Sequence, residues 1–178
     1  MTLWDFKQRV LRLIEEIDVD KKELTDDPDI SNKFNTVTNQ LMFELFRYKG
    51  IIVKDTVNVT ENEEFILNEE YSDFYQLKII KGVEYNIDDN IVTFLEDGKA
   101  TIYYYKYPKA ITKDTEDTYK FELATEVLEC MVYGVAADIL KSDVSSNYGQ
   151  VYAQRYSELK QMLDPRQSQG SVYIDGGI

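Results

Sequence analysis

The residue types that most often carry catalysis or bind metals are scarce in this chain. Histidine is absent, which removes the commonest general base and the commonest metal-ligating side chain. The sequence contains no glycine-rich phosphate loop and no Gly-x-Ser-x-Gly turn. Its single cysteine, Cys130, cannot form an internal disulfide and lies in an apolar helical pattern. A buried thiol that acts as a small hydrophobic side chain is the expected role there.

One group of carboxylates invites comparison with a calcium-binding loop. Asp18 and Asp20 fit the first and third positions of such a loop. The match fails further along, because Lys22 occupies the fifth position, Glu23 stands where glycine is needed and Asp29 takes the twelfth. We therefore interpret this stretch as an ordinary solvated loop.

A second group of carboxylates lies at predicted strand edges and turns, and its members are Glu61, Glu63, Glu64, Glu69 and Glu70. Charge at such places blunts edge-to-edge aggregation of strands. A glycosidase pair would require folding to bring two of them together by accident. We expect no catalytic residues, no metal site and no cofactor, and the sequence does not look like that of an enzyme.

The composition is that of a globular chain with a strong acidic excess. The 178 residues include 33 acidic and 20 basic side chains, which gives a net charge of −13. Binding to a phosphate backbone depends on Lys and Arg, so this charge argues against nucleic-acid binding as the main activity. The acidity serves either solubility or a surface that faces DNA without retaining it.

Nothing in the sequence predicts a membrane protein. No apolar run approaches the roughly 20 residues that cross a bilayer. The first eighteen residues interleave charged with apolar side chains, unlike a secretory signal. A soluble protein made in a cytoplasm is the expected product.

Apolar periodicity predicts two helices before residue 50. The first spans about 3–17 and begins with Thr2 and Asp5 as a capping pair. The second has Pro28 in its first turn and is expected to end at Gly50.

Two more helices are predicted after a polar connector. The third is apolar most of the way round, which is typical of a central helix, and its core positions are Val127, Met131, Val135 and Ile139. Gly134 would let a neighbouring helix approach closely. The fourth spans about 147–163, with an apolar stripe of Tyr148, Val151, Tyr152, Tyr156, Leu159 and Met162 or Leu163.

Between the two helix pairs the apolar period changes to two, which predicts about six short strands. Turns are expected at 88–90 and at Asp97-Gly98, where Asp-Gly is a strong hairpin signal. The predicted fold class is α+β. About four helices form a bundle from residues 1–49 and 109–165, an antiparallel β-sandwich or barrel is inserted at 50–108, and an extended C-terminal arm covers 166–178.

The last predicted strand contains four tyrosines between residues 101 and 108. Alternation places Tyr103, Tyr105 and Tyr107 on one side, with Ile102 and Tyr104 on the other. A sheet on a single core normally has one apolar and one wet face, so large side chains on both faces need an explanation. One possibility is that Tyr104 fills the core while the other tyrosines are half exposed.

The layout resembles the head-to-tail adaptor, or connector, family of tailed bacteriophages, in its tubular-adaptor branch. The matching positions run along most of the chain and are Leu3, Val10, Leu13 and Ile14; residues 71–77; Asn90-Ile91; residues 104–108; and Tyr152, Arg155, Tyr156 and Leu159. The signal lies in their order and spacing. Ser72 departs from the family pattern, which often has proline there.

The resemblance implies a structural virion protein. Such adaptors form a ring, usually a dodecamer, beneath the portal protein and continue the DNA channel towards tail or neck proteins. DNA would pass through without specific binding, and the protein would reside in the host cytoplasm only during assembly. In a ring, Tyr103, Tyr105 and Tyr107 would contact the helical bundle or the next subunit, since aromatic rings with a polar tip suit such surfaces.

The C-terminal arm is polar and then β-prone at Val172, Tyr173 and Ile174, and it ends at Ile178. Such an arm is suited to adding a strand to an edge on a partner. The resemblance assigns it to portal docking, whereas a frayed terminus is the plain alternative.

Two other functions remain open from the sequence. One is an acidic DNA mimic that inhibits a DNA-binding enzyme. The other is a sugar-binding or peptide-binding β-module on a helical scaffold.

Overall fold

The structure is a computed structural model that describes residues 1–14, 28–142 and 147–163. The chain divides into two compact units. Met1–Ile51 and Tyr107–Asp164 form the first, here called the helical unit, and Ile52–Lys106 belong to the second, here called the β-unit. The described residues contain five α-helices and two small antiparallel sheets, which confirms the α+β fold class.

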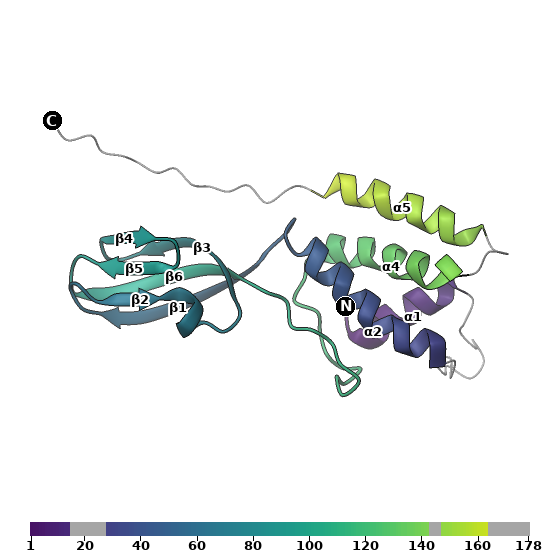
Figure 1. Cartoon of the computed structure of the whole chain (residues 1–178), viewed down its shortest axis with the longest axis horizontal. Helices are drawn as coiled ribbons and strands as arrows, with labels where there is room; N and C mark the ends of the chain where they lie inside the picture. The colour runs from purple at the N-terminus through teal and green to yellow at the C-terminus, as the bar shows by residue number, and fades with distance from the viewer. Residues whose placement is uncertain (15–27, 143–146, 164–178) are drawn as a thin grey trace. The chain divides into compact units, whose positions relative to one another are not determined.

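The helical unit contains four of the helices and a short 3-10 turn (Figure 1). Their bounds are α1 (Leu3–Leu13), α2 (Pro28–Leu45), α4 (Thr125–Ile139), the turn η1 (Leu140–Ser142) and α5 (Tyr148–Met162). The start of α1 is as predicted, because Thr2 Oγ1 accepts from the Asp5 backbone N–H and Asp5 accepts from the Thr2 N–H, each at 3.1 Å. α2 begins at Pro28, where the fixed φ of proline suits a first helical residue.

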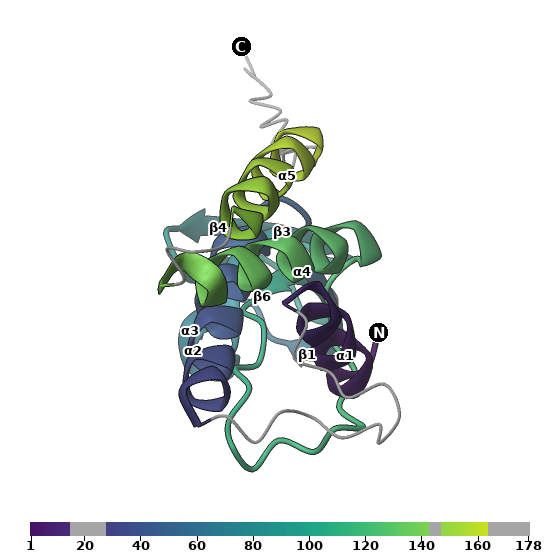
Figure 2. The same cartoon turned by 90° about the vertical axis from the view of Figure 1, so that its right-hand side faces the viewer.

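α4 is the helix on which the others pack. It contacts α1, α2 and α5, and Figure 2 shows α5 on one side of it and α1 and α2 on the other. Val127, Met131 and Val135 are fully buried, and Ile139 is nearly so. Gly134 lies at a close crossing, since a Cβ there would stand 2.8 Å from Leu41 of α2 and 2.9 Å from the ring of Tyr156 of α5.

Ion pairs at the surface connect the same helices. Arg9 of α1 pairs with Glu129 of α4, and Lys160 of α5 pairs with Glu44 of α2. Exposed pairs of this kind stabilise a fold by at most about 1 kcal/mol each. The apolar residues buried around α4 therefore dominate the stability of the helical unit.

The β-unit contains six strands and the one-turn helix α3 (Leu67–Glu70). β1 (Ile51–Val59), β6 (Gly98–Lys106) and β3 (Phe74–Lys81) form one sheet in the order β1-β6-β3. β2 (Glu64–Ile66), β5 (Ile91–Phe94) and β4 (Tyr85–Asp88) form the other in the order β2-β5-β4. In the described residues these strands do not close into a barrel, so that alternative in the prediction is wrong.

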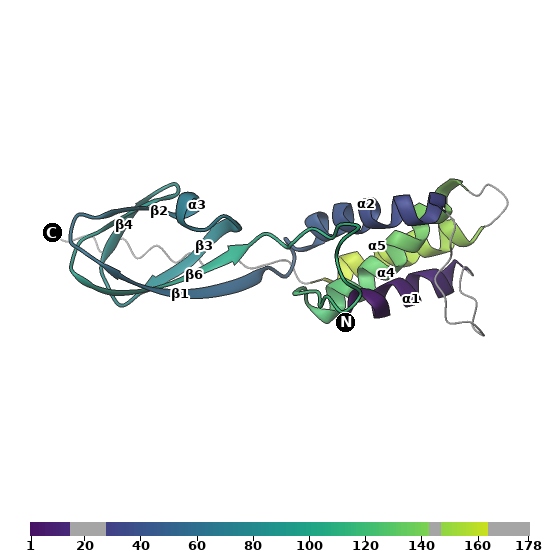
Figure 3. The same cartoon turned by 90° about the horizontal axis from the view of Figure 1, so that it is seen from below.

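The two sheets share one apolar core. Ile80, Ala100, Ile102 and Tyr104 enter it from the first sheet, and Val92 and Phe94 enter it from the second. Figure 3 shows β1, β3 and β6 on one side of the unit, and β2, β4 and α3 on the other. Each sheet therefore has an inner face on this core and an outer face directed away from it.

The structure confirms one of the two predicted turns as a hairpin. β4 pairs with β5 in antiparallel register, with Asp88 opposite Ile91, so Asp89 and Asn90 form a two-residue turn. Asp89 has φ 52°, a left-handed conformation that aspartate tolerates.

The hairpin predicted at Asp97-Gly98 is wrong. The strands on its two sides, β5 and β6, belong to different sheets, so this turn carries the chain from one sheet to the other. Asp97 Oδ1 accepts a hydrogen bond from the Glu61 N–H at 2.8 Å. This bond holds the turn against the loop before β2.

Two helix predictions also need correction. α2 ends at Leu45, before Gly50, because residues 46–49 form turns that lead into β1. α5 lies where predicted, but its apolar stripe is not buried throughout: Tyr148 and Val151 are each 57% exposed, and Met162 is 75% exposed. α5 packs mainly on α4 and contacts α1 and α2 through Tyr152, Tyr156 and Lys160, which leaves Tyr148, Val151 and Met162 exposed.

Candidate functional site

β6 presents tyrosines to both faces of its sheet, as the sequence alternation predicts. Its residues alternate between exposed or half-buried and fully buried positions, and Tyr104 is only 4% exposed. Tyr103 and Tyr105 are half-buried on the outer face. Tyr104 is therefore a core residue of the β-unit, whereas Tyr103 and Tyr105 belong to the outer surface of the sheet.

Tyr104 is held in the core by a second tyrosine and two carboxylates. Its ring stacks on Tyr71, with centroids 4.5 Å apart and planes at 23°. Tyr104 donates to Asp73 Oδ1 at 3.0 Å, and Tyr71 donates to Asp55 Oδ2 at 2.9 Å. Burial, followed by the hydrogen bond to Asp73, raises the pKa of Tyr104 from 10.0 to about 12, and burial with Asp55 raises the pKa of Tyr71 further.

These raised pKa values predict a loss of stability in alkali. The folded state holds both phenols neutral, so their contribution is complete below pH 10.0 and declines as pH rises towards the folded pKa of about 12. Urea unfolding midpoints measured across this range should fall with pH. In a Tyr71→Phe, Tyr104→Phe variant the loss of two hydrogen bonds should lower stability at neutral pH by about 1 kcal/mol for each bond. That variant should also show a shallower alkaline decline, and an equally steep decline would contradict the assignment.

The outer face of the sheet β1-β6-β3 combines tyrosine rings with lysines, and we call it the lysine–tyrosine face. Lys81 and Lys54 lie over the Tyr103 ring at 5.6 and 6.0 Å, and Lys78 lies over the Tyr105 ring at 5.7 Å. Lysines at such distances gain about 0.5–1 kcal/mol each at exposed sites. The lysines over the rings contribute to the partial burial of both tyrosines.

The lysines of this face escaped the sequence prediction, which considered only the tyrosines. Strand alternation in β1 and β3, combined with the pairing of β3 and β6, would have placed these lysines beside the tyrosines. Ile79 pairs with Tyr103 and Lys81 with Thr101 in the antiparallel ladder, which places them on the outer face. The register between the strands is a tertiary feature that one strand alone does not reveal.

Tyr107 is separated from the other two predicted contact tyrosines. β6 ends at Lys106, and Tyr107 belongs to the helical unit. There its ring lies 5.5 Å from Phe46 and 6.3 Å from Phe43, and it is 41% exposed. The structure thus brings together Tyr103 and Tyr105 but not Tyr107.

α5 is fixed to the helical unit by the polar tips of two tyrosines. Tyr152 donates to the Leu13 carbonyl oxygen at 2.9 Å, and Tyr156 donates to Glu44 at 3.1 Å. Burial, followed by the nearby Glu44 charge, raises the pKa of Tyr156, so its phenol acts as a neutral donor at physiological pH.

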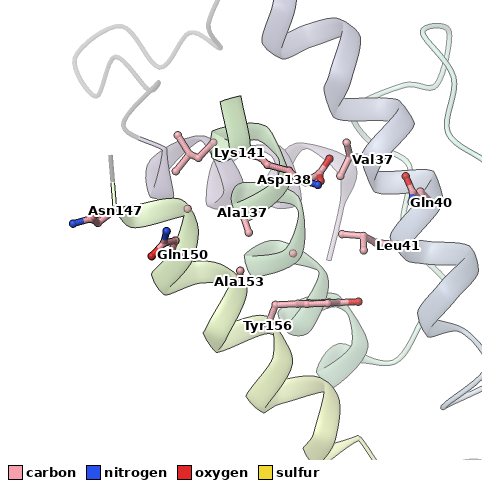
Figure 4. A pocket seen from close by; sticks show the side chains of 13 residues that line it. Val37, Gln40, Leu41, Ala137, Asp138, Lys141, Asn147, Gln150, Ala153 and Tyr156 are labelled. Atoms are coloured by element: carbon pink, nitrogen blue, oxygen red, sulfur yellow. The ribbon is translucent and has the colours of Figure 1, made fainter. Parts of the chain in front are cut away.

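A cleft of about 490 Å³ lies between α2, α4 and α5 (Figure 4). Val37 and Leu41 line it from α2, Ala137 from α4 and Tyr156 from α5. Its ionisable lining residues other than Tyr156 are Asp138 and Lys141.

The described residues contain no candidate metal site. No group of three or more His, Cys, Asp or Glu side chains among them could hold a metal ion. Burial raises the pKa of the Cys130 thiol to about 11, so it is not a thiolate at neutral pH. In the same part of the chain, no helix has both the length and the hydropathy to cross a bilayer.

Several sequence predictions lie outside the described residues. They are the calcium-like stretch from Asp18 to residue 27, the end of the first predicted helix at 15–17, and the arm with Val172, Tyr173, Ile174 and Ile178.

Comparisons with known proteins do not assign this chain to a family. No protein-family model and no curated protein matches this chain.

Proposed function

We propose that this chain is a structural virion protein of a tailed bacteriophage, a head-to-tail adaptor that forms a ring beneath the portal protein. The ring, a dodecamer in this proposal, continues the DNA channel and links the head to downstream neck or tail proteins. The helical unit acts as a four-helix bundle, and the β-unit acts as a sandwich inserted between α2 and α4.

The observation that carries the proposal is the division of the chain. Met1–Ile51 and Tyr107–Asp164 build one compact unit, and the intervening residues build another. This is the order that the resemblance implies for tubular adaptors. The outer lysine–tyrosine face and the exposed side of α5 further support a protein that works through contacts with other chains.

The direct test is the position of the protein in assembled particles. An affinity-tagged chain should be found at the head–tail junction by low-resolution imaging, as ring-shaped density below the portal. Particles made without the protein should lack tails or lose DNA. Particles that contain no tagged protein at any stage of assembly would contradict the proposal.

A second test concerns the passage of DNA. We expect no measurable binding of the isolated protein to a labelled duplex at physiological ionic strength, because the net charge of −13 repels phosphates. Fluorescence anisotropy over a salt series checks this expectation. Saturable binding whose affinity falls steeply with salt would count against a passive channel.

A further inference from the structure

The charges of the β-unit are divided between its two sheets. The strands β1, β3 and β6 carry Lys54, Lys78, Lys81, Lys99 and Lys106. Their only carboxylate is Asp55, which accepts from Tyr71 towards the core. Lys54, Lys78 and Lys81 form no ion pair within the described part of the chain, and all three are exposed.

The segments that form the second sheet and its connections have the opposite charge. Residues 60–73 and 82–97 contain no Lys or Arg, and their acidic side chains are Glu61, Glu63, Glu64, Glu69, Glu70, Asp73, Glu84, Asp88, Asp89, Glu96 and Asp97. The net charge of the chain does not reveal this division of basic and acidic residues between the two sheets.

Strand register places some of these carboxylates on the outer face of the sheet β2-β5-β4. Val92 and Phe94 enter the core, so Ile91 and Thr93 point outwards on β5. Asp88 is opposite Ile91 and Glu64 is opposite Thr93, which puts both carboxylates on the outer face. We call this surface, together with the exposed Glu69 and Glu70 of α3, the acidic face.

Both faces also have an apolar component. On the lysine–tyrosine face Ile79 is 41% exposed beside Tyr103, and Ile52 is 48% exposed on β1. On the acidic face Ile91 is 39% exposed between Thr93 and the turn. Exposed isoleucines surrounded by charge are suited to a contact with an apolar centre and a polar rim.

We propose that copies of this chain associate head to tail through the β-unit, the lysine–tyrosine face of one copy against the acidic face of the next. A two-fold contact would place each face against itself and oppose like charges. A head-to-tail contact instead opposes unlike charges, and repetition of it produces a ring when the rotation closes. This inference deepens the proposed function, and it rests on that function only for the closure into a ring.

The test uses two charge reversals in the full chain. The first variant, K54E/K78E/K81E, makes both faces acidic, and the second, E64K/E69K/D88K, makes both faces basic. A control variant, D114K/E116K/D138K, has the net charge of the second but alters exposed residues of the helical unit. Sedimentation velocity over a concentration series at low and high salt measures self-association.

The wild-type chain should associate with rising concentration, more weakly at high salt. Each reversal alone should weaken association at least about 30-fold, because three exposed pairs each change it by a factor of a few. An equal mixture of the two reversals should associate again, since each altered face meets its altered partner. The helical-unit control, whose β-unit is unaltered, should associate like the wild type.

The opposite results would overturn the proposal. These are a wild-type chain that stays monomeric under all conditions, a first reversal that associates like the wild type, or a helical-unit control that loses association as each reversal does. The neutral K54Q/K78Q/K81Q variant covers the case in which the reversal fails to fold, and it too should associate more weakly. Duplex binding by the wild type that the first reversal removes, with unchanged association, would assign the face to nucleic acid instead.

The same variants separate this inference from the proposed function. Association as expected in a protein that is absent from particles would refute the adaptor and leave the contact standing. Normal incorporation of the first reversal into particles would refute the contact and leave the adaptor standing.

Discussion

Replacing Val135 with aspartate is expected to unfold the helical unit. Val135 is fully buried on α4, the helix that contacts α1, α2 and α5. The substitution removes apolar packing and buries an unpaired carboxylate, which together should lower the free energy of unfolding by at least about 4 kcal/mol. That is a large share of the stability of a domain whose total is about 5–15 kcal/mol. Thermal unfolding followed by far-UV circular dichroism measures the change.

The matched control is Ser157→Asp, which adds the same charge at an exposed position of α5. It should change the melting temperature little, because surface substitutions usually alter stability by less than about 0.5 kcal/mol. A soluble Val135→Asp protein that melted like the wild type would show that α4 is not the centre of this core.

Deleting residues 168–178 is expected to abolish attachment to portal-bearing heads while leaving the melting temperature nearly unchanged. The described apolar cores lie between Leu3 and Leu163, so the deletion removes none of their residues. The deleted segment carries the β-prone residues Val172, Tyr173 and Ile174, which we propose add a strand to an edge of the portal protein. Co-sedimentation of the protein with purified heads measures attachment.

Two variants refine this experiment. Replacing Val172, Tyr173 and Ile174 with serine should abolish attachment as the deletion does, whereas replacing Gln167, Ser168 and Gln169 with alanine should not. Normal attachment of the truncated protein would exclude the arm from portal docking. A truncated protein that did not fold would show that the segment belongs to one of the cores.

Local patterns predicted much of the secondary structure because their physical causes are local. The Thr2 and Asp5 cap needs only the backbone of one helical turn, and it forms as expected. The turn at Asp89-Asn90 likewise depends on residues that tolerate a left-handed conformation. The helix from Thr125 follows from an apolar pattern too broad for a surface helix.

The predictions were wrong where the structure of a segment depends on which other segment packs or pairs with it. Asp-Gly at 97–98 has the chemistry of a hairpin, yet the strands beside it pair with β3 and β2 instead of each other. The apolar pattern of α5 predicts a buried stripe, but α5 packs mainly on α4 and leaves Tyr148 and Val151 exposed. Sequence periodicity predicts which residues form an apolar face. It does not predict whether a neighbouring element buries that face.

The sequence by itself determined the α+β class, the alternation that sends Tyr104 inwards and Tyr103 and Tyr105 outwards, and the scarcity of catalytic side chains. The tertiary structure decided which strands share a sheet, and with that which charges share a face. Five lysines and twelve carboxylates lie along one stretch of chain, residues 52–106, so the sequence alone suggests a uniformly acidic unit. They separate only because non-adjacent strands pair, β1 with β6 and β2 with β5, which long-range hydrogen bonds and a shared core fix and no local pattern encodes.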